Sequence, residues 1–348
     1  MHLSEFNFPF DLSLIATEPV LPREQAKLLV LSPRHQAITH RRIADLAELL
    51  DPGDLVVVND TRVRLARVKG RKCSGQSVDI LFVKPVADRE WEVLMRGTWH
   101  AGQVIDVDAN ARLTVLQREK GRTVVRIEGT VPITDWFQTH GRMPLPPYIK
   151  RPPTDEDLEW YQTVFASHEG AIAAPTAGLH FTPALLNRLA DRRIELAKVT
   201  LHVGVGTFKP VRADRVEEHR MESEWVDVGP ETVRAIEQAK EKKKKIVAVG
   251  TTVVRALESA ASGQGSLRAY RGQTSLFIVP GYRFQIVEAL LTNFHLPQTT
   301  LLMLVSAFAG TGLLRRAYEE AVRTKYRFYS YGDAMFVTDR EAPRGVAR

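Results

Sequence analysis

The sequence predicts an α/β fold. A discontinuous, barrel-like α/β domain, residues 1–62 and 149–348, carries an inserted small antiparallel β-barrel domain, residues 63–148. Three observations predict it. Strand and helix patterns are mixed in the first part of the chain, short alternating runs without a helical period follow, and strands then alternate with helices to near the end. Alternation of the last kind is typical of a largely parallel sheet or a partly open barrel.

The N-terminal part predicts two strands and a helix of the main domain. Residues 26–31 and 55–58 are apolar runs of strand length, and residues 42–50 have helical spacing. Asp-Pro-Gly-Asp at 51–54 is turn chemistry before the second run. Asn-Asp-Thr-Arg at 59–62 follows that run, which places polar side chains at the end of a buried strand.

The middle of the chain predicts an all-β insertion. Short alternating runs recur at residues 78–83, 91–95, 104–107, 113–116 and 123–127. Their spacing is typical of a small antiparallel barrel or sandwich. The run Met-Pro-Leu-Pro-Pro-Tyr-Ile at 143–149 predicts a proline-stiffened linker back to the main domain.

The C-terminal part predicts alternating strands and helices. The expected strands are residues 171–174, 195–201, 246–249 and 275–279. The expected helices are residues 185–190, 233–244, 252–261, 300–308 and 313–323. The N-terminal strands would join this sheet, so the main domain is discontinuous.

Composition limits the class of protein. A chain of 348 residues with 44% apolar and 26% charged residues is expected to form two globular domains. Cys73 is the only cysteine, so neither an intrachain disulfide nor a cysteine-based metal site is expected. We see no signal peptide, and the best apolar run, residues 301–310, is too short to cross a membrane. We therefore expect a cytoplasmic protein.

The charge balance favours a polyanionic partner. The formal net charge is +7, and cationic surfaces bind nucleic acids through counterion release. The densest cationic run, Lys242 to Lys245, lies at the end of a predicted helix. There the positive charges suit the helix dipole, and we interpret this run as a solvated helix terminus rather than as an RNA contact.

Polar residues gather in five segments that lie next to predicted strands. Ligands of α/β sheets bind beyond the carboxyl ends of the strands. Gly and Thr loops there offer N–H groups and hydroxyls to a carboxylate, a ribose or a purine edge. Three histidines, His180, His202 and His295, could transfer protons near neutral pH. The five segments are residues 59–62, 175–182, 202–208, 250–255 and 292–297.

Several common chemistries lack their motifs. No P-loop, G-x-S-x-G or H-E-x-x-H motif occurs, and Gly204-Val205-Gly206 lacks the third glycine of a dinucleotide fingerprint. His168-Glu169 has no second histidine at helical spacing, so no metal site is expected.

Long segments resemble the family of S-adenosylmethionine:tRNA ribosyltransferase-isomerases of queuosine biosynthesis, the QueA family. The resemblance runs in order from about residue 5 to 336 and is carried by residues 58–63, 143–149, 161–166, 173–182, 199–204, 248–252, 292–297, 326–328 and 330–335. One departure is Glu222, where many members have a histidine in H-x-M-H-x-E. His219 and Glu224 of that motif remain candidates for a catalytic role.

The resemblance implies an enzyme with a specific reaction. It would transfer and isomerise the ribosyl part of S-adenosylmethionine onto 7-aminomethyl-7-deazaguanine at the tRNA wobble position. Epoxyqueuosine-tRNA, adenine and methionine would be the products. S-adenosylmethionine would be a consumed substrate, with no metal or separate cofactor expected. The family's fold is similar to the one predicted here.

This chemistry needs a base near C5′ of S-adenosylmethionine, a proton acceptor for the attacking amine and an acid for departing adenine. We hypothesise that His180 and His202 transfer these protons, with His295 as a third catalytic candidate. The predicted substrate-binding residues are Asn59, Asp60, Arg62, Thr176, Phe181, Gly204, Gly206, Thr207, Thr251, Thr252, Arg255 and Asn293.

For tRNA, we predict contacts from Arg64, Lys150 and Arg151, and we expect a monomer. Two alternatives stay open. The first is another S-adenosylmethionine-dependent RNA-modifying enzyme such as a methyltransferase, against which the lack of a glycine-rich first strand-to-helix loop counts. The second is a non-catalytic RNA-binding protein, which would not require five polar strand ends.

Overall fold

The computed structural model describes residues 1–8, 10–119, 122–208, 211, 215–262 and 265–339, with the side chains of 207 and 208 outside that description. The chain divides into two units. The first comprises Met1–Arg62, Pro147–Arg151 and Glu159–Arg348, and the second comprises Val63–Pro146 and Pro152–Leu158. The predicted boundaries, 62/63 and 148/149, differ from this grouping at residues 147–148 and 152–158.

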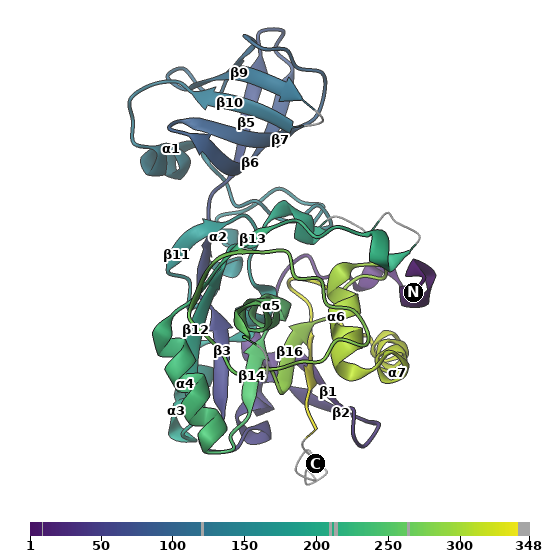
Figure 1. Ribbon diagram of the computed structural model, residues 1–348. Coiled ribbons are helices and arrows are strands. Elements are labelled where there is room, and N and C mark those ends of the chain that lie inside the picture. Colours follow the sequence, from purple (N-terminus) through teal and green to yellow (C-terminus); the bar gives the residue numbers. More distant parts are fainter. Residues whose placement is uncertain (9, 120–121, 209–210, 212–214, 263–264, 340–348) are drawn as a thin grey trace. The chain divides into compact units, whose positions relative to one another are not determined.

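The first unit is built on a nine-stranded mixed sheet with the strand order β15-β13-β12-β3-β14-β16-β17-β1-β2 (Figure 1). Strands β12, β3, β14 and β16 are parallel to one another, and β17 is antiparallel to β16. The strands are β1 Lys27–Ser32, β2 Ala37–Arg42, β3 Leu55–Asn59, β12 Glu195–Leu201, β13 Glu224–Val228, β14 Ile246–Val249, β15 Tyr270–Thr274, β16 Ala289–Asn293 and β17 Ala334–Val337.

Apolar side chains cover both faces of this sheet. In β3, Leu55 and Val57 belong to one core cluster, whereas Val56 and Val58 belong to the other, because successive side chains point to opposite faces. A strand buried on both faces therefore appears in the sequence as a continuous apolar run. Helices α4 and α5 pack against β12, β3 and β14, and α7 packs against β1.

The helices agree largely with the predicted ones. They are α1 Ile133–His140, α2 Asp157–Trp160, α3 Pro183–Asp191, α4 Pro230–Glu241, α5 Thr251–Ala260, α6 Thr300–Ala309 and α7 Thr311–Arg323. The run expected to be helical at 42–50 is a 3-10 helix, η4 (Ile43–Leu49). The shorter 3-10 helices are η1 Leu3–Phe6, η2 Leu12–Leu14, η3 Arg23–Gln25, η5 Thr176–His180, η6 Val205–Phe208 and η7 Val216–Glu218. No helix in the described part of the chain is long and apolar enough to cross a bilayer.

The second unit contains a closed antiparallel barrel with the order β10-β7-β6-β5-β8-β9. Its strands are β5 Arg67–Lys72, β6 Ser77–Ala87, β7 Glu90–Met95, β8 Val104–Asp106, β9 Arg112–Glu119 and β10 Arg122–Ile127. Its interior includes an aromatic group in which Phe82, Trp91 and Phe137 meet edge to face. The predicted α/β class and the inserted barrel are both confirmed.

Two predicted strands are wrong. Residues 275–279 form no strand, and the strands in that region are β15 and β16 instead. Residues 171–174 are not a strand of the large sheet, because the strand there is β11 (His168–Ala171), which pairs with β4 (Thr61–Val63).

Candidate active site

Four parallel strands bring polar segments to one edge of the sheet. Strands β12, β3, β14 and β16 are neighbours and end at Leu201, Asn59, Val249 and Asn293. Because parallel strands point the same way, the segments that follow them meet at their carboxyl ends. The fifth predicted segment, residues 175–182, does not follow a strand of the large sheet. It reaches the same edge, because residues 175–177 line the pocket described next.

A pocket of about 230 Å³ lies in the first unit. Five predicted site residues line it: Thr176, Thr251, Thr252, Asn293 and His295. The whole lining is Tyr148, Ala173, Ala174, Pro175, Thr176, Ala177, Val203, Gly250, Thr251, Thr252, Thr292, Asn293, Phe294, His295, Leu296, Pro297, Thr299, Leu301, Tyr329 and Ser330.

Two helices begin at this pocket. Gly250 has a φ of 93°, which glycine adopts without strain, and it turns the chain from β14 into α5. No side chain caps the N-terminus of α5, so its first N–H groups can serve a ligand's acceptors. At the start of α6, by contrast, the Thr299 side chain accepts a hydrogen bond from the Leu302 N–H.

His180 lies behind Asn293 and is not among the residues that line the pocket. The side chain of Asn293 places Nδ2 3.3 Å from His180 Nε2 and 3.0 Å from the carbonyl oxygen of Tyr329. Burial, helped by the charge of Arg23, lowers the pKa of His180 to about 3. The ring is therefore neutral at pH 7 and accepts a hydrogen bond from Asn293.

His295 lines the pocket, and its Nε2 lies 2.9 Å from Thr292 Oγ1. Burial lowers the pKa of His295 to about 4, so this ring is also neutral at pH 7. Its backbone is fixed by Tyr318, whose hydroxyl contacts both the N–H and the carbonyl of His295.

His202 is half-buried and held from two sides. Its Nδ1 lies 2.8 Å from Thr61 Oγ1, and its ring stacks on Trp225 with centroids 4.8 Å apart. Gly170 permits this position, because a Cβ there would lie 2.5 Å from the His202 ring. His202 is thus the most accessible of the three predicted catalytic histidines.

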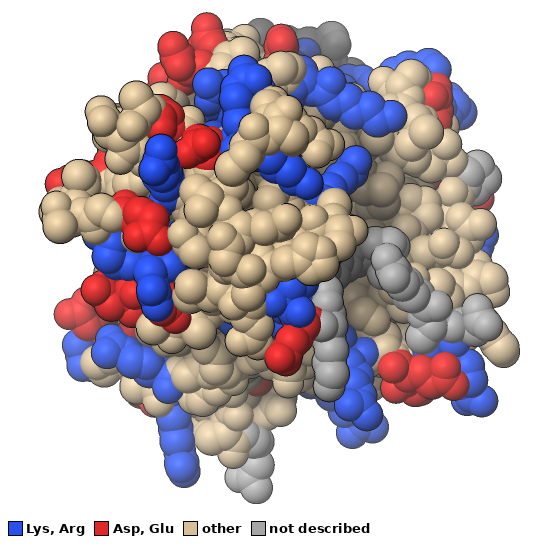
Figure 2. Space-filling model, turned by 90° about the horizontal axis from the view of Figure 1, so that it is seen from above, with Lys and Arg blue, Asp and Glu red and all other residues tan. Residues whose placement is uncertain are grey.

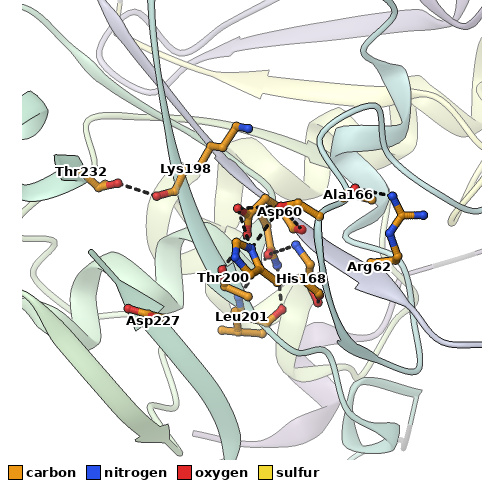
Figure 3. A network of polar contacts seen from close by, with 12 residues as sticks. Asp60, Arg62, Ala166, His168, Lys198, Thr200, Leu201, Asp227 and Thr232 are labelled. Carbon is orange, nitrogen blue, oxygen red and sulfur yellow. Dashed lines mark hydrogen bonds and ion pairs between the residues drawn. The ribbon is translucent and has the colours of Figure 1, made fainter. Parts of the chain in front are cut away.

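Asp60 organises a polar network beyond β3 (Figure 3). Its Oδ1 accepts from Thr200 Oγ1 at 2.6 Å, and its Oδ2 lies 3.2 Å from Ser167 Oγ and 3.1 Å from His168 Nδ1. The carboxylate is buried, whereas the His168 side chain is 65% exposed. Near it, Arg62 donates to the Ala166 carbonyl. Asp60 therefore joins β12 and the loop before β11 to the end of β3.

Arg255 was predicted to bind substrate, but it is not among the residues that line the pocket. Its guanidinium and Glu224 form a buried ion pair, and its Nε donates to the Leu276 carbonyl at 3.0 Å. The other oxygen of Glu224 accepts from the Gly204 N–H at 2.9 Å. The pair thus links α5 and β13 to the turn after β12. Gly204 and the candidate Glu224 are both part of this buried link.

None of the remaining predicted residues whose side chains are described lines the pocket. Phe181 packs in the core against Phe165, with centroids 5.4 Å apart. Gly206 approaches Glu222 closely, and the Thr207 side chain lies outside the described residues. In the second unit, the Arg64 guanidinium lies over the Trp91 ring. In the first unit, Lys150 is exposed and Arg151 donates to the Thr17 carbonyl.

Sequence reasoning missed two aromatic residues of the pocket, Tyr148 and Tyr329. Tyr148 lies in the segment interpreted as a linker, and its hydroxyl is 2.5 Å from Ser330 Oγ. The rings of Tyr148 and Tyr329 are 3.9 Å apart between centroids. The signal was present, since Tyr148 belongs to one of the motifs that carry the family resemblance.

A largely apolar pocket with a few hydrogen-bonding groups, at the carboxyl edge of parallel strands, is the kind of site at which α/β enzymes bind organic substrates. The family model described as "Queuosine biosynthesis protein" matches residues 3–337. The chain therefore belongs to the queuosine biosynthesis protein family.

Individual relatives agree with this assignment. A protein of Xanthomonas oryzae pv. oryzae is 47% identical over 347 residues, 98% of each chain. One of Citrifermentans bemidjiense is 47% identical over 341 residues, 97% of this chain and 100% of the relative. Both are named S-adenosylmethionine:tRNA ribosyltransferase-isomerase. The chain is accordingly an enzyme of the transferase and isomerase class.

A solved structure is similar as well. The crystal structure of an S-adenosylmethionine tRNA ribosyltransferase from Thermotoga maritima has a TM-score of 0.57 and 35% sequence identity. The match covers 96% of this chain and 100% of that one. The resemblance therefore extends over both the α/β part and the inserted barrel.

Proposed function

We propose that the protein transfers and isomerises the ribosyl moiety of S-adenosylmethionine onto 7-aminomethyl-7-deazaguanine in the anticodon of tRNA. The products are epoxyqueuosine-tRNA, adenine and methionine. The observation that carries the proposal is the family match over residues 3–337. Relatives named S-adenosylmethionine:tRNA ribosyltransferase-isomerase, at 46–47% identity over nearly the whole chain, support it.

His202 is the proposed proton-transfer residue. It lies after β12 at the edge of the sheet, and the Thr61 hydroxyl fixes the orientation of its ring. Proton transfer requires a group that meets solvent or substrate, and His180 is buried and is not among the residues that line the pocket, whereas His295 lines it and stays a second candidate. A His202→Ala variant that folds and turns over at the wild-type rate would remove this residue from the mechanism.

The reaction is tested by incubating the protein with S-adenosylmethionine and tRNA that carries 7-aminomethyl-7-deazaguanine. Mass spectrometry then follows the small molecules and the digested nucleosides. Adenine, methionine and epoxyqueuosine are expected together, and only with the modified tRNA. S-adenosylhomocysteine with a methylated nucleoside would identify a methyltransferase, and tRNA binding without turnover would identify a binding protein.

The tRNA partner is proposed to contact Arg64, Lys150 and Arg151. Figure 2 shows Lys and Arg side chains in several separate groups, with Asp and Glu among them and other residues over most of the view. The net charge of +7 supports a polyanionic partner. A cytoplasmic location and a monomeric state complete the proposal, and size-exclusion chromatography with light scattering tests the latter.

A further inference from the structure

The pocket is uncharged. Among the described residues that line it, none is Asp, Glu, Lys or Arg, and burial keeps His295 neutral at pH 7. Burying an unpaired charge in such surroundings is costly. S-adenosylmethionine carries its sulfonium, ammonium and carboxylate charges in the methionyl part, whereas its adenine is neutral. The lining therefore suits the base and not the methionyl part.

The size of the pocket leads to the same conclusion. Its volume of about 230 Å³ lies below the roughly 300–1,000 Å³ of pockets that enclose a whole drug-sized ligand. A pocket of this size holds one portion of S-adenosylmethionine, such as its base, and leaves the rest outside. Apolar lining residues, including Ala173, Pro175 and Leu301, offer contact to the faces of a planar ring.

One hydrogen-bond acceptor in the lining has no partner in the protein. Asn293 is 2% exposed, and its Oδ1 bonds to no other described atom. The orientation of this amide is fixed, because the Tyr329 carbonyl can only accept and so requires the NH₂ group on its side. The atom left over is therefore an acceptor. An unsatisfied buried acceptor costs about 1–3 kcal/mol, which a ligand N–H would recover.

A second unpartnered atom lines the same pocket. Thr252 Oγ1 is buried and has no hydrogen-bond partner among the described residues. A hydroxyl both donates and accepts. Adenine presents its 6-amino donor next to a ring-nitrogen acceptor on either edge, so Asn293 and Thr252 supply the complementary types of group.

We infer that this pocket binds the adenine base of S-adenosylmethionine, with Asn293 Oδ1 accepting from the 6-amino group and Thr252 Oγ1 donating to a ring nitrogen. His180 and the Tyr329 carbonyl act as positioning groups, because both hold the NH₂ end of the Asn293 amide. The inference rests on the proposed function, since that function supplies the ligand. It also predicts rejection of hypoxanthine, in which the 6-amino donor is replaced by an acceptor.

The test is calorimetric binding of uncharged nucleosides to the full-length protein without tRNA. The probes are 5′-methylthioadenosine and 5′-methylthioinosine, which differ in the base edge, and L-methionine. We expect 5′-methylthioadenosine to bind at least about tenfold tighter than 5′-methylthioinosine. The inosine loses the hydrogen bond to Asn293 and places its 6-oxo acceptor against the acceptor Oδ1 of that residue. Equal affinities, no detectable binding of the adenosine, or displacement of the adenosine by methionine would each overturn the inference.

Variants then locate the preference. Asn293→Ala is expected to reduce the preference for the adenosine to near unity. Asn59 offers a matched control, since it is also 2% exposed and ends β3, another parallel strand of the same sheet. Both atoms of its amide bond to protein groups, so Asn59→Ala is expected to keep the preference. A preference that survives in Asn293→Ala overturns the assignment.

Thr252→Val guards against loss of folding. The Thr252 hydroxyl has no protein partner to lose, so this variant is expected to fold and to bind the adenosine several-fold more weakly. Unchanged affinity would contradict the role of Thr252. Turnover of S-adenosylmethionine by the wild type is measured in parallel. A preference for the adenosine without turnover would support the adenine subsite and refute the proposed reaction. Turnover without that preference would support the reaction and refute the subsite.

Discussion

Two buried neutral histidines are expected to make the stability of the protein strongly dependent on pH. His180 and His295 are 4% and 9% exposed, and burial lowers their pKa values from 6.5 to about 3 and about 4. In the unfolded chain both would titrate near 6.5. Below that pH the unfolded state therefore binds more protons than the folded state, and acid favours unfolding.

The size of the effect follows from the pKa values. At pH 7 neither state binds many protons, whereas at pH 5 only the unfolded state is protonated at these two positions. One pKa unit corresponds to about 1.36 kcal/mol, so each histidine removes about 2 kcal/mol of stability between pH 7 and pH 5, and the pair about 4 kcal/mol. The stability is fully present above pH 6.5 and is lost as the pH falls toward the folded-state values.

Urea unfolding followed by tryptophan fluorescence at pH 7, 6 and 5 measures this loss. His180→Gln keeps an acceptor for the Asn293 amide and removes the titrating group, so about 2 kcal/mol of the pH dependence is expected to disappear. His295→Gln should act similarly. His100→Gln replaces an exposed histidine and should leave the pH dependence unchanged. A wild-type slope preserved in both buried-site variants would refute the reasoning.

Three further outcomes are expected. Asp60→Asn removes the carboxylate that receives three side-chain hydrogen bonds, and urea unfolding should show a loss of about 1–3 kcal/mol. Arg255→Met leaves the Glu224 carboxylate buried without its ion-pair partner, and the loss should reach about 3–5 kcal/mol. Charge reversal at Lys150 and Arg151 should weaken tRNA binding and reduce the slope of log affinity against log salt by about 2.

Each of these has a result that would contradict it. Asp60→Asn as stable as the wild type would show that the network in Figure 3 contributes nothing. For the ion pair, the double variant Glu224→Gln/Arg255→Met serves as the control and should be more stable than Arg255→Met, because it buries no unpaired charge. For tRNA, charge reversal at Lys243, in the run interpreted as a solvated helix terminus, should have no effect. Unchanged affinity of the Lys150/Arg151 variant at low salt would refute that contact.

Much of the fold followed from the sequence because local pattern decides it. Residues 55–58 form a continuous apolar run, which a strand buried on both faces requires, and β3 lies there. The alternating runs between 78 and 127 correspond to barrel strands β6 to β10. The family resemblance also lay in contiguous motifs, so no spatial information was needed to detect it.

Strand pairing was decided only by tertiary structure. Residues 275–279 and 289–293 are both short apolar runs, and nothing local distinguishes them. Only the second has partners on both sides, since β16 is hydrogen-bonded to β14 and β17. The barrel strand β5 was likewise missed. Its sequence is rich in Lys and Arg, and only its pairing with β6 and β8 makes it a strand.

The site shows the same division at single residues. Asn59 and Asn293 have the same side chain, the same burial and the same place at the end of a parallel strand, and the sequence predicted one role for both. The backbone of Leu201 and Thr61 bonds to both the nitrogen and the oxygen of the Asn59 amide. The carbonyl of Tyr329, 36 residues away in the chain, occupies only the nitrogen of Asn293. Sequence determined which polar groups reach the edge of the sheet, and the hydrogen bonds formed between distant segments decided which of them remain available to a substrate.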